Sequence, residues 1–160
     1  MLLNILDGAP VWVWPLLLLL VLFGFRATRS RQISRRSGYV LAGLGAIGLG
    51  TVAELPDPVM AWSGFGIGYF VGVATGYKLQ TKWIMETGAQ TVTVRGEWFT
   101  LLSLMIMFWS NFANGFVEEV HPAIHGTAAF QLLFTLAIGW VSGCFLGRTI
   151  RILRSRSLSR

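Results

Sequence analysis

The sequence predicts an all-α membrane protein that crosses the bilayer five times, with its N-terminus outside and its C-terminus in the cytoplasm. Three observations predict this class. The 160 residues are 54% hydrophobic and only 12% charged, with a mean hydropathy of +0.62, which is too apolar for a small soluble domain. Five stretches of nearly membrane-spanning length contain no Asp, Glu, Lys or Arg. The positive charges all fall in connections on one side of these stretches.

Each charge-free stretch predicts one helix, because about 20 helical residues cross a hydrocarbon layer about 30 Å thick. The first stretch is expected to be a retained helix and not a signal peptide, since the first basic residue, Arg26, follows the apolar run. Flanking residues complete the two shorter stretches. The expected helices are 8–25, 37–54, 58–77, 97–118 and 123–153, with cytoplasmic loops 26–36 and 78–96 in a single transmembrane bundle.

The charge distribution sets the orientation. All 13 Lys and Arg residues lie in the two loops and in the segment from Arg148 onward, which the positive-inside rule assigns to the cytoplasm. Five of the seven acidic residues fall on the opposite side: Asp7, Glu54, Asp57, Glu118 and Glu119. The net charge of +6 is therefore explained by topology and by anionic lipid on the cytoplasmic side, and no nucleic-acid partner is expected.

No catalytic or cofactor motif is present in the sequence. The one cysteine, Cys144, lies inside the last predicted helix, where it cannot form an intrachain disulfide or a dithiol redox pair. No nucleophile has an identifiable base at a suitable spacing. The chain is therefore not expected to be an enzyme or to bind a cofactor.

Small residues at a spacing of four form the most specific pattern, because lipid-embedded helices associate where small side chains allow close approach. Three predicted helices carry such stripes. They consist of Gly64, Gly68, Gly72 and Gly76 in helix 58–77; Gly139, Gly143 and Gly147 in helix 123–153; and Gly38, Ala42, Ala46 and Gly50 in helix 37–54, which leads to Glu54.

The favoured interpretation of these stripes is tight packing within one chain, and the stripes of helices 37–54 and 58–77 could face each other as a hairpin. The alternatives are an interface between copies of the chain or sliding surfaces in a transporter.

The predicted helix 97–118 is the polar one. Its polar residues fall largely on one side, which is expected to face the bundle interior because unpaired amides are costly in hydrocarbon. Asn111 and Asn114 are expected to meet the last helix, with Gln131 and Thr135 as their partners. Structural hydrogen bonding is the favoured role; the alternative is a polar path for a transported solute. The intramembrane polar set is Asn111, Asn114, Glu118, Gln131 and Glu54.

Histidine and carboxylate residues gather at the outer end of this helix. Imidazole and carboxylate can hold zinc or copper, so Glu118, His121 and His125 are weak candidates for a metal site. Their spacing matches no closed zinc motif, and Pro122 is typical of a helix start. Solvated groups at headgroup level are therefore the default interpretation.

The longer cytoplasmic loop contains one period-two pattern. Thr91 to Val94 reads TVTV, which predicts a short strand or hairpin on the inner face.

Four segments carry a resemblance to known proteins: ILDGAPVWVWPLLLLL near the N-terminus, RGEWFTLLSL before the polar helix, HPA after it, and the closing GCFLGRTIRILR. Together they resemble a family of small multi-pass bacterial inner-membrane proteins classed as a domain of unknown function. A weaker similarity is to multi-spanning accessory proteins of cytochrome c biogenesis, although no haem-attachment or CxxC motif is present. The resemblance implies the topology given above and no activity.

The sequence thus predicts an accessory or interaction protein of the bacterial inner membrane. Its expected partners are membrane lipids, anionic on the cytoplasmic side, and a second copy or another membrane protein. The alternatives are a small oligomeric transporter or channel that uses the polar helix, and an outer-face metal-binding protein.

Overall fold

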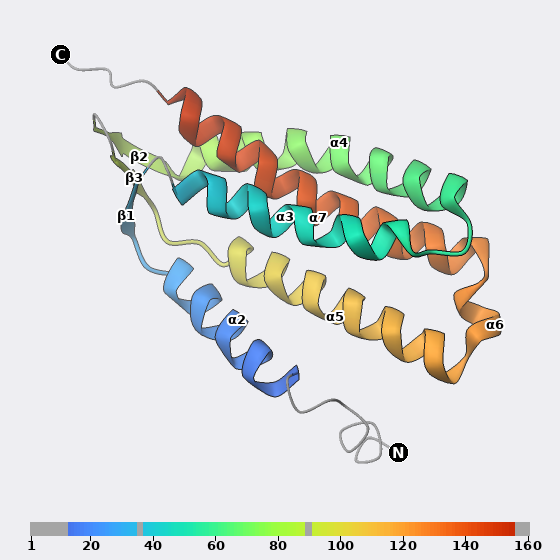
Figure 1. Cartoon of the computed structure of the whole chain (residues 1–160). Helices are drawn as coiled ribbons and strands as arrows, with labels where there is room; N and C mark the ends of the chain where they lie inside the picture. Colours follow the sequence, from blue (N-terminus) through green and yellow to red (C-terminus); the bar gives the residue numbers. More distant parts are fainter. Residues whose placement is uncertain (1–12, 35–36, 89–90, 156–160) are drawn as a thin grey trace.

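The structure is a computed structural model that describes residues 13–34, 37–88 and 91–155 as a bundle of helices with a small sheet at one end (Figure 1). The end that carries the strands is called the sheet end, and the opposite end, where α6 lies, is called the α6 end. The helices in the described ranges are α2 (Val13–Ala27), α3 (Ser37–Ala53), α4 (Pro58–Trp83), α5 (Phe99–Val120), α6 (Pro122–His125) and α7 (Ala128–Arg154).

Three helices, α4, α5 and α7, are long and apolar enough to cross a membrane, and α2 is a shorter apolar helix. The predicted class, a largely helical multi-pass membrane protein, therefore holds at this level. Residues 8–12 of the first expected helix lie outside the described residues.

Helix α4 begins at Pro58 and runs six residues past the predicted end at 77, to Trp83. The Asp57 carboxylate caps its start by accepting hydrogen bonds from the backbone N–H groups of Val59 (3.0 Å) and Met60 (3.1 Å). The prediction ended the helix at its first charge, Lys78. A charged residue does not by itself end a helix, and α4 continues through Lys78, so this boundary was wrong.

The expected single helix 123–153 is divided into α6 and α7. The break comes at Thr127, whose backbone is extended and whose hydroxyl accepts a hydrogen bond from the N–H of Phe130. The same hydroxyl donates to the carbonyl of Ile124 at 2.7 Å. Thr127 therefore both ends one turn and caps the long helix that follows.

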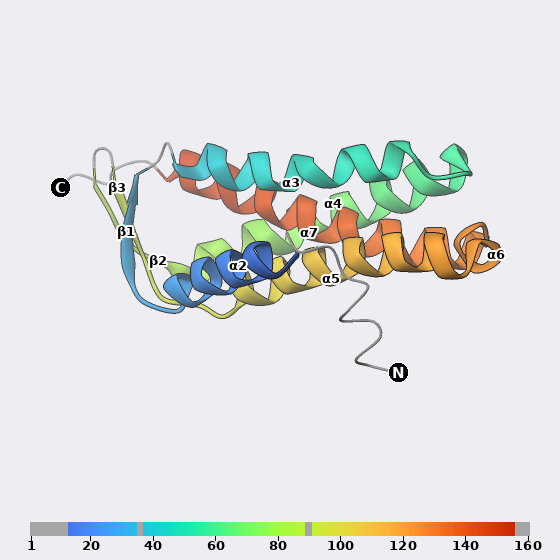
Figure 2. The same ribbon diagram turned by 60° about the horizontal axis from the view of Figure 1, so that its bottom comes forward.

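The strands are β1 (Arg31–Ser34), β2 (Ile84–Thr87) and β3 (Thr91–Val94), joined antiparallel in the order β1-β3-β2. The hairpin predicted around TVTV is therefore present. The third strand, β1, was not predicted, because its RQIS sequence lies in a basic segment with little apolar alternation. Val92 and Val94 pack against Ile152 of α7, which fixes the sheet across one end of the bundle (Figure 2).

Helices α4 and α7 form the centre of the bundle and pack backbone to backbone. A Cβ atom built on Gly72 would overlap the carbonyl oxygen of Trp140, and one built on Gly143 would overlap that of Tyr69. A Cβ on Gly68, Gly76, Gly139 or Gly147 would likewise overlap a backbone carbonyl of the facing helix, and one on Gly64 would overlap the hydroxyl of Thr135. The two glycine faces thus lie against each other within one chain.

Helix α3 contacts α7 more extensively than it contacts α4. The glycines that approach α7 are Gly45, next to Ser142, and Gly48, next to Ile138. By contrast, Ala46 is exposed and a Cβ on Gly50 would meet nothing within 4 Å. The predicted packing of the α3 stripe is therefore wrong for these members, because the helix turns an adjacent face inward; the side chains at positions 38 and 42 lie outside the description.

Candidate functional site at the sheet end

A buried ion pair lies where α7 passes the start of α5. The Nη2 atom of Arg148 is 2.9 Å from Oε1 of Glu97, and the two side chains are only 2% and 5% exposed. Two charges are removed from water here, which is costly unless their remaining polar atoms are also hydrogen-bonded.

The guanidinium of Arg148 meets that condition through two more hydrogen bonds. Its Nε donates to Oε1 of Gln80 at 2.9 Å, and its Nη1 donates to Oγ1 of Thr100 at 2.8 Å. The planar guanidinium presents its N–H groups in a rigid fork, so it can contact several partners at once. One side chain of α7 thereby joins α4, α5 and the segment before α5.

Glu97 also caps α5. Its Oε2 accepts a hydrogen bond from the backbone N–H of Thr100 at 2.7 Å, and its Oε1 accepts one from the Thr100 hydroxyl. A carboxylate at a helix N-terminus pairs with free N–H groups and with the positive end of the helix dipole. Glu97 thus serves the ion pair and the helix start together.

Aromatic rings cover the cluster formed by Arg148, Glu97, Thr100 and Gln80, which is called the Arg148 cluster below. The Cζ atom of Arg148 lies 5.2 Å from the ring centre of Trp83 and 6.0 Å from that of Phe99. Cation–π attraction at such distances favours the charged guanidinium, which is only 2% exposed to water. The Nε2 atom of Gln80 is buried without a hydrogen-bond partner.

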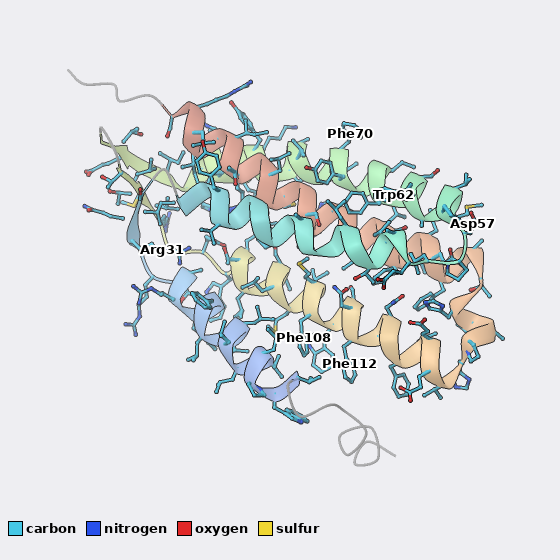
Figure 3. The ribbon with its side chains drawn as sticks, in the orientation of Figure 1. Arg31, Asp57, Trp62, Phe70, Phe108 and Phe112 are labelled. Carbon is cyan, nitrogen blue, oxygen red and sulfur yellow. The ribbon has the colours of Figure 1, made fainter. Side chains whose placement is uncertain are left out.

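Arg31 of β1 lies close enough to the Arg148 cluster to interact electrostatically with Glu97 and Arg148. Burial lowers the pKa of Arg31, the Glu97 carboxylate opposes this, and the positive charges of Arg148 and Arg26 add to the lowering. Three guanidinium groups therefore share the field of one carboxylate, which leaves the sheet end locally positive. Figure 3 shows Arg31 at this end and Asp57 at the α6 end.

The predicted polar face of α5 is partly internal, but its partners differ from those expected. Asn114 is buried and its Oδ1 lies 3.2 Å from Nε2 of His125, not against Gln131. Asn111 accepts a hydrogen bond from the hydroxyl of Thr51 on α3 at 3.1 Å and donates to the carbonyl of Met107 at 2.8 Å. Asn114 thus meets the range 123–153 as expected, but through His125, and the named partners Gln131 and Thr135 were wrong, as was the expectation that Asn111 meets this range.

Gln131 is fully buried at the start of α7. Its Oε1 accepts a hydrogen bond from the backbone N–H of Asp57 at 3.1 Å, and its Nε2 donates to the carbonyl of His125 at 3.5 Å. Gln131 therefore ties the loop before α4 to the break between α6 and α7, which is a structural role.

The remaining predicted site residues are not gathered into a site. Glu54, Glu118 and His121 are exposed, whereas His125 is buried against Asn114. Within the described ranges no group of three or more His, Cys, Asp or Glu side chains is arranged to hold a metal ion. Glu118, which belongs to the side of helix 97–118 that was expected to face the bundle interior, is therefore not in the interior, and the metal candidates Glu118, His121 and His125 do not converge.

Sequence reasoning missed the Arg148 cluster because it assigned both Glu97 and Arg148 to the charges that lie at the cytoplasmic surface. One signal pointed to it: Gln80 continues the four-residue spacing of the α4 glycines past Gly76, so it had to face α7. A second signal was the position of Glu97, an acid on the basic side.

The chain was compared with protein families, curated proteins and solved structures, and nothing matches. The resemblance to a family of inner-membrane proteins therefore stays a prediction.

Proposed function

We propose that this chain is an integral protein of the bacterial inner membrane that acts as an accessory or interaction protein and not as an enzyme. In this proposal it crosses the bilayer five times, with the sheet end in the cytoplasm and the α6 end outside. The distribution of charge supports the orientation. Lys78 and Lys82 lie at the sheet end of α4, and Asp57 caps its opposite end.

One observation carries the proposed role: the two central helices interlock through their glycines, and Arg148 of one of them hydrogen-bonds to Gln80, Thr100 and Glu97. Transporters work by moving one part of the bundle past another around a central site. Here the contact of α4 with α7 is backbone to backbone, and the Arg148 cluster joins the same two helices to α5. A rigid centre of this kind suits a scaffold that presents its outer helices, α2 and α3, to a partner.

Single-cysteine labelling tests the orientation. In a Cys144→Ala background, one variant carries Glu119→Cys and the other carries Arg154→Cys, both at exposed positions at opposite ends of the bundle. A membrane-impermeant maleimide should label the first in intact cells and the second only after permeabilisation. The reverse pattern would refute the orientation.

Site-specific photocrosslinking in cells tests the interaction role. A photoreactive residue at Leu22 of α2, which is 62% exposed, is compared with one at Phe70 of α4, which is 76% exposed. We expect a discrete protein adduct from α2 and lipid adducts alone from α4. Lipid adducts at both positions, with every other exposed position of α2 and α3 giving the same result, would reject the role.

The second candidate function is a small transporter or channel. It is favoured by two buried hydroxyls without a hydrogen-bond partner, those of Ser103 on α5 and Ser142 on α7, since unpaired polar groups in a bundle can mark a path. Reconstituted vesicles provide the test: solute or ion flux that Asn114→Leu abolishes, with the fold intact, would establish this function in place of the accessory role.

A further inference from the structure

An apolar hollow lies on the surface of α5 at its sheet end. It has a volume of about 520 Å³ and is lined by Trp98, Phe99, Leu101, Leu102 and Met105. Trp98 is 65% exposed and Leu102 is 55% exposed, so the hollow is open to the surroundings of the bundle. Its size and its apolar lining suit a hydrocarbon chain.

The end of α2 is fixed beside this hollow. The ring of Phe25 lies edge-on to that of Trp98, with centroids 5.9 Å apart. The backbone N–H of Glu97 donates to the carbonyl of Ala27 at 3.0 Å, and the N–H of Gly96 donates to the hydroxyl of Ser30 at 3.4 Å. The chain that follows α2 is therefore held against the chain that precedes α5.

Three exposed arginines lie on these two adjoining segments: Arg26, Arg29 and Arg95. Within the described residues the single ion pair is that of Arg148 with Glu97, so the Glu97 carboxylate is already engaged and these three cations have no carboxylate partner. Arg31, whose positive charge interacts with that of Arg26, lies on the same connection after α2. An apolar hollow thus adjoins concentrated positive charge, at the level where a tryptophan marks the membrane interface.

We propose that this hollow, with Arg26, Arg29 and Arg95 beside it, binds an anionic phospholipid. The acyl chain lies against Trp98 and Leu102, and the phosphate is held by the arginines, whose guanidinium groups form paired hydrogen bonds with phosphate oxygens. Two features favour a phospholipid over another occupant: the combination of an apolar hollow with adjoining cations, and the membrane around a bundle of this composition.

The inference rests on the proposed membrane placement, which assigns the lipid to the cytoplasmic leaflet. The binding itself is independent of orientation. A test on purified protein in detergent can therefore fail while the topology stands, and cysteine labelling can reverse the topology while the binding stands.

The test is native mass spectrometry of the full chain in detergent, titrated with phosphatidylglycerol or phosphatidylethanolamine of identical acyl chains. We expect a single phosphatidylglycerol adduct at lower lipid concentration than the phosphatidylethanolamine adduct. In the variant R26Q/R29Q/R95Q the ratio of the two affinities should fall by about ten- to a hundredfold, because each arginine near an anionic headgroup contributes roughly a fivefold factor.

The matched control is K78Q/K82Q/R154Q, which removes the same charge from exposed positions at the same end and should keep the wild-type ratio. A further variant, Leu102→Trp, fills the hollow and should weaken adducts of both lipids with the arginines in place. Equal loss in the control would overturn the site in favour of general surface attraction. A lipid-free dimer, or equal binding of both lipids by the wild type, would overturn it as well.

Discussion

Arg148 and Glu97 lie 51 residues apart in the sequence and form a 2.9 Å salt bridge in the interior of the bundle. This pair connects the last helix to the start of α5, next to the point where the sheet meets the bundle. The contribution of this pair to stability depends on whether all its polar atoms are hydrogen-bonded. A buried pair that meets this condition is tolerated, whereas one partner left alone is an unpaired charge in an apolar medium.

Replacing one partner should therefore be far more harmful than replacing both. We expect Arg148→Met to lower the free energy of unfolding in detergent by about 3 to 5 kcal/mol, because it leaves the Glu97 carboxylate buried and unpaired. The double variant Arg148→Met/Glu97→Leu should recover part of this loss. Denaturant titration followed by tryptophan fluorescence measures both.

Arg151 gives the matched control for this prediction. It lies one turn further along α7, is less buried, and donates to the hydroxyl of Thr81 at 2.9 Å. Arg151→Met should cost less than about 1 kcal/mol. A loss as large as that of Arg148→Met would show that burial in the Arg148 cluster does not make Arg148 more important for stability than an arginine outside it.

The interlocking of α4 and α7 predicts opposite effects at two glycines of the same helix. A Cβ on Gly72 would overlap the backbone of Trp140, whereas one on Gly66 would meet nothing within 4 Å. Gly72→Ala should therefore force the helices apart and lower the melting temperature. Gly66→Ala should be neutral or stabilise by up to about 1 kcal/mol, since alanine favours the helix. Equal melting temperatures of the two variants would mean that the close approach is absent.

Much of the bundle follows from the sequence because hydropathy, charge placement and the glycine period are local patterns. The glycines of α4 and α7 show this, since a four-residue spacing defines a helix face whatever the neighbour is. The neighbour itself is not local information. Nothing in the pattern around Asn111 says that its partner is Thr51 of α3, and nothing in the RQIS segment says that it pairs with TVTV sixty residues later.

The Arg148 cluster was missed for the same reason. A charge near a predicted helix end reads as a residue that reaches water, and only the packing of α4 on α7 shows that Arg148 points inward. The stripe on α3 failed differently: glycines are so frequent there that more than one face meets the spacing rule, and the packed face is the one with Gly45 and Gly48.

The sheet should be separable from the bundle in stability. Val92 is fully buried and packs with Val94 and Ile152 in a cluster distinct from the main core. Val92→Ser should therefore increase hydrogen exchange in β1 and β3 while leaving α4 and α7 protected. Thr91→Ser, at an exposed neighbouring position, is the control and should change little. Loss of protection throughout the chain would instead show that sheet and bundle unfold together.

The contact between Asn114 and His125 decides between a structural and a transport role for α5. Both side chains are 7% exposed and their polar atoms are 3.2 Å apart, so each provides the other's hydrogen bond away from water. Asn114→Leu leaves the His125 ring nitrogen without that partner and should lower the unfolding free energy by about 1 to 3 kcal/mol. The double variant Asn114→Leu/His125→Phe should cost less than the sum of the two single variants, because the second substitution removes the group that the first leaves unpaired.

His121→Phe, at an exposed position outside this pair, should be additive with Asn114→Leu. Two results together would contradict the structural role: additive effects of the Asn114 and His125 substitutions, and a measurable flux that Asn114→Leu removes. They would show that this face of α5 serves transport.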